Sequence, residues 1–336
     1  MRSIKIFIVL LCFCMCLTSC RNGVSTNTSS AKNESETAVE STVSTPENDV
    51  LEEPILPQKP TAAVTPSGIN MGKKIAVTGE LQNYEYSQDL LKLEAILNSH
   101  KYNISLSVYA VDGSKGLEYN TESEIFGACT VKAAYTLYAC RQMDKGNGSL
   151  QTQITYQEKH YEPGTGDMQY SPFGTVFSMK TALGKSMSIS DNVGYLMSVD
   201  FFGRDGYNEW ASTLGCDSLK IKPTVWSLRT KANDLVKVWC EIYNYFESDA
   251  PHSKFLYDSC TGTAGNYATA SLDGVKYSHK QGHNSTGDWL SYSDAGIVWK
   301  GDSPYIIAIL TDAPGPNNYS ATEFAKIIDI VHNKLF

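Results

Sequence analysis

A thiol and an amine stand three residues apart in the segment Cys129-Thr130-Val131-Lys132. Residues at this spacing share one face of a helix, so the two side chains can meet. A cation lowers the pKa of a neighbouring thiol because it stabilises the thiolate, and a neutral amine could instead accept the thiol proton. The pair could therefore form a nucleophile, although a small buried cysteine beside a surface lysine satisfies the same pattern.

Two further short patterns carry polar groups in the same chain. The sequence SDN at 190–192 follows a run that is expected to be helical, and these residue types favour helix caps and turns. The sequence KQG at 280–282 closes a strand-like run, where glycine can mark the close approach of another backbone. Each pattern, taken singly, also fits a purely structural role.

The elements that must position these patterns follow from the periodicity of apolar residues. Helical spacing predicts helices over 87–100, 129–143, 178–188, 191–202, 206–213, 231–246 and 320–335. Alternation predicts a strand over 104–111, and 117–120 could be its return strand. Three more strand-like runs, 275–282, 291–300 and 303–312, are separated by short turns. Ser320 and Glu323 form a capping-box pattern for the last helix. We therefore expect an α+β fold, with one antiparallel sheet formed from both termini plus an inserted helical lobe.

The first 20 residues, MRSIKIFIVLLCFCMCLTSC, join a positive start to an apolar run. The run is too short for a membrane span, which needs ~20 apolar residues, and is typical of an export signal. Leu17-Thr18-Ser19-Cys20 resembles the bacterial lipobox. This implies lipidation of Cys20 and a lipid anchor at the extracytoplasmic face of the bacterial cell membrane. An ordinary cleaved signal with a chance cysteine is the alternative.

Residues 21–78 are rich in Ser, Thr, Asn, Glu and Pro and poor in aromatic residues. Such a segment cannot bury enough apolar surface to offset its ordering entropy, so we expect a flexible tether. Residues 79–336 are long enough for one large domain. The net charge of −8 and the lack of a basic stripe argue against nucleic acid as a partner. We expect a monomer.

Cysteine usage argues against a metal centre. No Cys-x-x-Cys pattern follows the signal and the histidines are scattered, so we expect no metal and no cofactor. Five cysteines remain in the domain, and their odd number leaves at least one thiol unpaired. Cys140, Cys216, Cys240 and Cys260 could be core thiols or could form a disulfide, because the sequence alone cannot pair them.

The order of the three patterns resembles that of class A β-lactamases and penicillin-binding proteins, which carry S-x-x-K, then S-D-N, then K-T-G. Here CTVK opens an apolar helix, SDN follows a helix of the middle region, and KQG precedes two more strands and a final helix. The resemblance covers essentially the whole of 79–336. It implies a β-lactamase/transpeptidase-like fold and an acyl-enzyme mechanism on β-lactam or D-Ala-type peptide substrates.

The resemblance also implies catalytic roles. Cys129 occupies the position of the nucleophilic serine, so the acyl-enzyme would be a thioester. Lys132 would act as its base or electrostatic partner. Ser190 would shuttle a proton toward the leaving nitrogen.

Roles in substrate binding follow from the same resemblance. Asn192 would hold the substrate's amide side chain, and Lys280, with Gln281 and Gly282 of the same motif, would attract the substrate carboxylate. The backbone N–H groups of Cys129 and His283 would form an oxyanion hole, where each donor contributes roughly 3 kcal/mol.

Three departures from the family pattern bear on turnover. Sulfur replaces oxygen at Cys129, and Gln281 replaces a hydroxyl residue. Class A β-lactamases also activate the deacylating water with a Glu that follows S-D-N. The only Glu within 193–236 is Glu209, in a run expected to be helical. We therefore expect slow deacylation.

Two alternatives stay open. The first is a lipid-anchored binding or sensing protein that keeps the cleft but has lost turnover. The second is a thiol hydrolase with a histidine base. Strand alternation places His279 and Lys280 on opposite faces, so His283 is the better candidate, but no partner that orients it is visible in the sequence. Trp289 could line the cleft, although packing is the more common role of such a residue.

Overall fold

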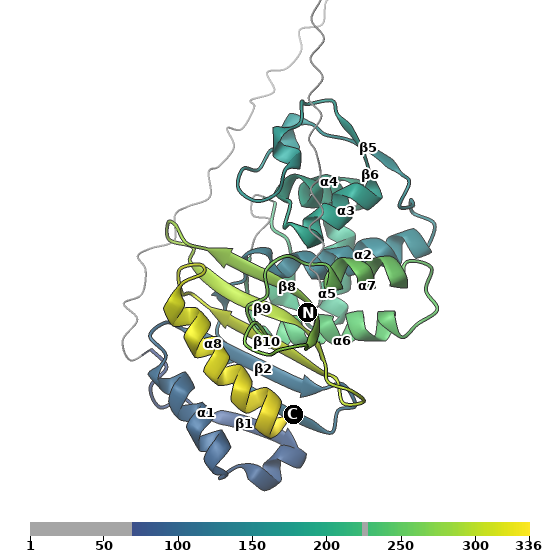
Figure 1. Ribbon diagram of the computed structural model, residues 1–336. Coiled ribbons are helices and arrows are strands. Elements are labelled where there is room, and N and C mark those ends of the chain that lie inside the picture. Colours follow the sequence, from purple (N-terminus) through teal and green to yellow (C-terminus); the bar gives the residue numbers. More distant parts are fainter. Residues whose placement is uncertain (1–68, 224–227) are drawn as a thin grey trace, which may run out of the picture. The chain divides into compact units, whose positions relative to one another are not determined.

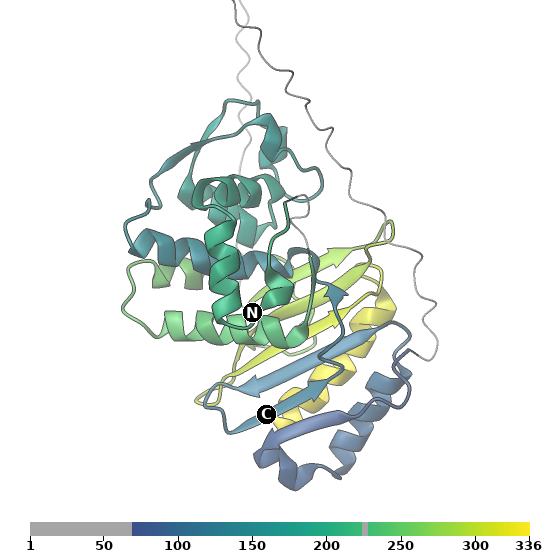
Figure 2. The same cartoon turned by 180° about the vertical axis from the view of Figure 1, so that it is seen from behind.

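The computed structural model describes residues 69–223 and 228–336. The expected export signal, the expected lipid site Cys20 and most of the expected tether lie outside these residues. The described residues form a six-stranded antiparallel sheet with helices against both of its faces, as Figure 1 and Figure 2 show from opposite sides.

The sheet joins the two ends of the domain. Its strand order is β1-β3-β2-β10-β9-β8. The strands are β1 (Ile75–Gly79), β2 (Ile104–Ala110), β3 (Lys115–Tyr119), β8 (Lys276–Asn284), β9 (Ser291–Trp299) and β10 (Tyr305–Thr311). The central pair is β2 with β10, in a register that matches Ala110 with Tyr305 and Ile104 with Thr311. The expected sheet built from both termini is therefore confirmed.

Strand β10 is apolar along its whole length because both of its faces are buried. Ile306, Ala308 and Leu310 belong to the core on the helical side of the sheet. Ile307 and Ile309 belong to a second core, under the terminal helices. Successive side chains of a strand point to opposite faces, so a run without alternation indicates a central strand that is covered on both sides.

Two terminal helices cover one face of the sheet. These helices, α1 (Gln88–Ser99) and α8 (Asn318–Ile330), lie against each other in Figure 1. The Ser87 side chain caps α1 by accepting a hydrogen bond from the backbone N–H of Leu90. Such a cap satisfies one of the amides left without a partner at a helix start.

The helical region covers the other face. Helix α6 (Ala232–Phe246) packs on β2, β9 and β10, and it buries Leu235, Val238, Trp239 and Ile242 at helical spacing. The other helices of this region are α2 (Lys132–Asp144), α3 (Met179–Ser188), α4 (Asn192–Phe202), α5 (Asp205–Thr213) and α7 (Ser253–Thr261). Short strands complete it: β4 (Ile125–Phe126), β5 (Gln153–Thr155), β6 (Val176–Ser178) and β7 (Arg229–Thr230).

Most expected elements are confirmed within a few residues, and three details are wrong. Helix α7, which has nine residues, was not expected. The capping box was expected at Ser320 and Glu323, but the cap of α8 is Asn317, whose side chain accepts from the backbone N–H of Ser320. The helix expected from residue 129 begins instead with the 3-10 turn η2 (Ala128–Val131).

The folded part of the chain also begins earlier than the boundary expected at residue 79. Strand β1 pairs with β3 through its whole length. Before it, the buried Asn70 side chain donates to the backbone oxygens of His100 (3.1 Å) and Tyr102 (2.7 Å). Its Oδ1 accepts from the backbone N–H of Ile104 at 3.4 Å. The polar residues before β1 are thus tied to the start of β2 by a single asparagine.

The cysteines of the described residues form no disulfide. Cys129, Cys140, Cys216, Cys240 and Cys260 are all free thiols, and all but Cys240 are buried. Of the four thiols whose pairing the sequence left open, Cys140, Cys216 and Cys260 are core thiols, and Cys240 is a partly buried thiol packed against the core.

A chain that begins at residue 79 lacks Asn70 and β1. We expect its free energy of unfolding, measured by urea denaturation, to fall several kcal/mol below that of a chain that begins at residue 69. Asn70→Ala in the longer chain should account for ~1–3 kcal/mol, since each lost hydrogen bond contributes ~1 kcal/mol. Equal stability of all three proteins would contradict this account of the boundary.

Candidate active site

The expected motif residues converge where β8 meets the helical region. Cys129 lies in η2, and Lys132 is the first residue of α2. Ser190 lies in the turn between α3 and α4, and Asn192 is the first residue of α4. Lys280 lies on β8. Groups that are far apart in the sequence are therefore brought to one place by the sheet edge and two helix starts.

Lys132 is buried and is held by acceptors from the SDN turn. Its Nζ donates to the backbone oxygen of Ser190 at 2.6 Å and to Oδ1 of Asn192 at 2.8 Å. Thr165 Oγ1 donates to the same Ser190 oxygen at 2.6 Å. Asn192 thus has a structural partner inside the protein as well as a place on the cleft wall.

Lys280 is also buried and contacts the same turn from the opposite side. Its Nζ donates to Ser190 Oγ. It also donates to the backbone oxygen and to Oε1 of Gln281, at 3.0 and 3.1 Å. The Gln281 amide in turn donates to the backbone oxygen of Ala264. The Gln281 amide is therefore engaged within the protein, and this residue is not part of the cleft wall.

Gly282 allows β8 to lie directly against the turn that carries Cys129. A Cβ at position 282 would lie 2.3 Å from the backbone oxygen of Gly127 and 2.9 Å from the backbone nitrogen of Cys129. Only glycine permits such an approach. The close contact brings the backbone of Cys129 next to the end of β8, where His283 follows.

Backbone strain is concentrated at this site. Ala128 (φ 47°) and Ser190 (φ 59°) are two of the three non-glycine residues with positive φ among the described residues. Such conformations cost of order 1–3 kcal/mol each and tend to persist where function requires them. One strained residue precedes the thiol, and the other presents its hydroxyl to Lys280.

The charges around Cys129 favour its thiolate. Burial alone would raise the pKa of this thiol, but the ammonium groups of Lys132 and Lys280 outweigh burial and lower it. The other four described thiols behave in the opposite way, because burial raises the pKa of Cys216 to about 12 and of Cys240 to about 11, and raises those of Cys140 and Cys260. Cys129 is therefore singled out electrostatically.

Burial also acts on the two lysines. It lowers the pKa of Lys132, and it lowers the pKa of Lys280 to about 8. Lys280 therefore changes its protonation close to neutral pH, and both amines exchange protons more readily than exposed lysines do.

An open cleft of about 310 Å³ lies in front of Cys129. His283 and Asn192 line it, as expected. The sequence analysis missed the other lining residues, which are Phe126, Ala128, Glu162, Pro163, Gly164, Thr165, Asn284 and Ser285. The tract GTG at 164–166 could have predicted this part of the cleft wall, because close-packed glycines often lie beside a ligand site. Glu162 precedes SDN, whereas the acid of class A β-lactamases follows it, so the motif order offered no reason to select Glu162.

Three residues near the motifs or in the sequence argument, Asp191, Glu209 and Trp289, are not among the residues that line the cleft. Asp191 caps α4, since its carboxylate accepts from the backbone N–H of Gly194 at 2.8 Å and of Met168 at 2.9 Å. Glu209 lies on α5 and is not among the cleft residues. The Trp289 ring packs on Phe126, with ring centroids 5.1 Å apart.

Within residues 69–223 and 228–336, no group of three or more His, Cys, Asp or Glu side chains is arranged to hold a metal ion. In the same part of the chain, no helix has the length and apolar character needed to cross a membrane.

Comparison with known proteins supports the resemblance seen in the motifs. Residues 91–335 match the family described as "Beta-lactamase enzyme family". No curated protein sequence matches the chain.

Solved structures share the fold at low sequence identity. PBP-A has a TM-score of 0.66 at 18% identity, with 74% of this chain and 96% of PBP-A covered. A PBP-A mutant solved as an acyl-enzyme complex with penicillin G has a TM-score of 0.65 at 19% identity, covering 73% and 94%. A β-lactamase from Sphaerobacter thermophilus DSM 20745 has a TM-score of 0.62 at 16% identity, covering 73% and 96%. These likenesses establish the β-lactamase/transpeptidase fold.

Lys280→Met removes one of the two charges that stabilise the Cys129 thiolate. We expect the pKa of the thiol to rise, and alkylation of Cys129 by iodoacetamide at pH 7 to slow by about tenfold or more. The measurement is the alkylation rate between pH 5 and 7, below the pKa of about 8 at which Lys280 loses its proton. Lys254→Met, which changes an exposed lysine on α7, is the matched control, and Cys129→Ala gives the background. An unchanged midpoint in Lys280→Met would show that Lys280 does not tune the thiol.

Proposed function

Because the chain belongs to the beta-lactamase enzyme family, we propose that it is an acyl-transfer hydrolase that forms a thioester on Cys129. The acyl donors are β-lactams or D-Ala-type peptides of the cell wall. The observation that carries the proposal is the position of Cys129, which among the five described thiols is the one with a lowered pKa and which lies near two buried lysines at the wall of an open cleft.

The chemistry begins with the thiolate of Cys129. It attacks the substrate carbonyl, and the C–N bond of the lactam or peptide breaks as the thioester forms. The leaving nitrogen needs a proton. Ser190 Oγ, which accepts a hydrogen bond from Lys280, is placed to pass one from that lysine to the nitrogen.

The negative charge that develops on the carbonyl oxygen needs donors that are fixed before the reaction. The backbone N–H groups of Cys129 and His283 supply them in this proposal. The close approach of Gly282 to the Cys129 backbone supports it, because that approach fixes the spacing between η2 and the end of β8.

Release of the acyl group is expected to be slower than its capture. The loop after SDN contributes no acid to the described cleft, so the water-activating Glu of class A β-lactamases has no counterpart there. A thioester is nevertheless more reactive toward amines than an ester, so transfer to an amine is a second way to release the acyl group.

A second candidate function is a binding or sensing protein that keeps the cleft without turnover. The observation that favours it is the side-chain amide of Gln281, which accepts from Lys280, donates to Ala264 and does not line the cleft. For either function we propose an extracytoplasmic location, with a lipid anchor at Cys20.

The decisive measurement is the intact mass of the protein after incubation with penicillin G and with a cephalosporin. We expect an adduct on the wild-type protein that is absent from Cys129→Ala. Its rate of decay separates a hydrolase from a trapped acyl-protein. Penicillin G is the natural first probe because a mutant of PBP-A, which shares the fold, is an acyl-enzyme with it.

Cys129→Ser is the matched variant for the same measurement. An adduct on this variant alone would mean that the scaffold is competent but that the thiol blocks β-lactam chemistry, which would favour the binding function. No adduct on any variant would overturn acyl transfer from these donors.

A further inference from the structure

His283 lies at the cleft, and the steps of acylation proposed above use only its backbone N–H. It follows Gly282 on β8, is exposed, and lines the same cleft as Cys129. Its Cβ and Cδ2 lie against the backbone of Gly315, since a Cβ built at Gly315 would lie 3.4 and 3.3 Å from these atoms. His283 thus shares a cleft wall with the thiol, and its side chain is confined on one side.

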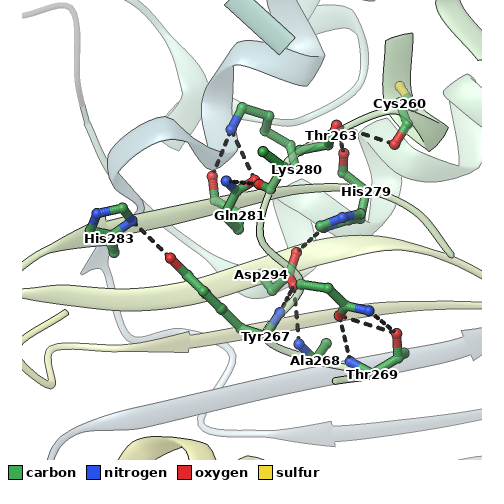
Figure 3. Close-up of polar contacts among 12 residues, drawn as sticks. Cys260, Thr263, Tyr267, Ala268, Thr269, His279, Lys280, Gln281, His283 and Asp294 are labelled. Atoms are coloured by element: carbon green, nitrogen blue, oxygen red, sulfur yellow. Dashed lines mark hydrogen bonds and ion pairs between the residues drawn. The ribbon is translucent and has the colours of Figure 1, made fainter. Parts of the chain in front are cut away.

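A tyrosine orients this imidazole. The Tyr267 hydroxyl forms a hydrogen bond with Nδ1 of His283, with 2.9 Å between oxygen and nitrogen (Figure 3). The Tyr267 ring is itself stacked on Tyr292 of β9, with centroids 4.4 Å apart and 19° between the planes. The sequence did not reveal a residue that orients His283. The structure shows that this residue is Tyr267, on the loop after α7.

A buried carboxylate holds that loop in place. Oδ2 of Asp294 accepts from the backbone N–H groups of Tyr267 at 2.9 Å and Ala268 at 3.0 Å. Its Oδ1 pairs with Nδ1 of His279 at 2.9 Å, on the face of β8 opposite Lys280, as alternation predicts (Figure 3). Asp294 is fully buried, so the position of Tyr267 is fixed by charge-assisted hydrogen bonds.

The imidazole of His283 is a neutral base at physiological pH. Burial and, to a lesser extent, the charge of Lys280 lower its pKa below the usual value. When Nδ1 carries the ring proton and donates it to the Tyr267 oxygen, Nε2 keeps a free lone pair. The hydrogen bond to Tyr267 therefore suits the tautomer that a general base requires.

We propose that His283 is the general base that releases the acyl group from Cys129, with Tyr267 as its positioning residue. This role rests on the proposed function, because it requires a thioester on Cys129. In this proposal His283 activates the water that attacks the thioester, a task for which the loop after SDN contributes no acid.

The proposed step balances without a redox partner. His283 Nε2 takes one proton from a water molecule, and the water oxygen bonds to the thioester carbonyl carbon. The tetrahedral intermediate then expels the sulfur of Cys129 as a thiolate, which the two lysines stabilise. The imidazolium returns its proton to solvent, and the products are a carboxylic acid and the free enzyme. An amine would be activated in the same way.

The titratable groups around His283 come from several elements. They are Tyr267 on the loop after α7, Tyr292 and Asp294 on β9, Lys280 on β8, and Cys129 and Glu162 across the cleft. Burial raises the pKa of Tyr267 and raises that of Tyr292 to about 12, so neither tyrosine titrates between pH 5 and 7. A pH dependence of release in that range that is lost in His283→Gln is then assigned to His283.

The test is the decay of the penicillin G adduct of the full chain, followed by intact mass from pH 5 to 8 in wild type, His283→Gln and Tyr267→Phe. We expect the adduct still to form in both variants, and its rate of formation is measured separately from its decay. Its decay should slow ~100-fold in His283→Gln, the usual size of a general-base effect, and by less in Tyr267→Phe. Wild-type decay should fall as pH drops below ~6.5, and this fall should vanish in His283→Gln.

His252→Gln, which makes the same change at a histidine paired with Asp144 in the helical region, is the control and should decay as wild type does. Equal decay of wild type and His283→Gln would overturn the base role and leave acyl transfer standing. So would a wild-type adduct that never decays. No adduct on the wild-type protein would overturn both the base role and the proposed function.

Discussion

Two ammonium groups buried within one site constrain the rest of this structure. Lys132 and Lys280 are each 0% exposed, and a charge removed from water is costly unless partners surround it. The SDN turn supplies partners to both, since the Ser190 carbonyl accepts from Lys132 and its hydroxyl accepts from Lys280. The strained backbone at Ser190 directs these two acceptors to different lysines. A thiolate on Cys129 adds the negative charge that the pair still needs.

The fold is the means by which this arrangement is assembled. One lysine starts a helix after the N-terminal strands, and the other lies on an edge strand formed near the C-terminus. They meet because the sheet is built from both ends of the domain and because Gly282 lets β8 touch the turn that carries the thiol. A buried charged group also positions the loop after α7. Asp294 accepts hydrogen bonds from the backbone of this loop, which carries Tyr267.

The sequence predicted those parts of the fold whose signals are local. Apolar periodicity was enough for α6, a continuous apolar run was enough for β10, and motif order was enough to place Cys129, Lys132 and Lys280 together. It failed where a long-range contact decides the outcome. Asn70 belongs to the domain because of hydrogen bonds to residues some thirty positions away, and Tyr267 contacts His283 because a carboxylate on another strand holds its backbone. No short-range pattern carries either contact.

The replacement of serine by cysteine changes what the lysines must do. A serine hydroxyl keeps its proton until a base removes it during attack, whereas a thiol with a usual pKa of ~8.5 is ionised by nearby cations alone. Lys132 can then serve as a counter-ion, and no strong base is needed for capture. A stabilised thiolate is also a good leaving group, so in the proposed mechanism the breakdown of the acyl-enzyme is limited by activation of the incoming water. The proposed mechanism therefore needs its base at the mouth of the cleft, where His283 lies, and not at the buried lysines.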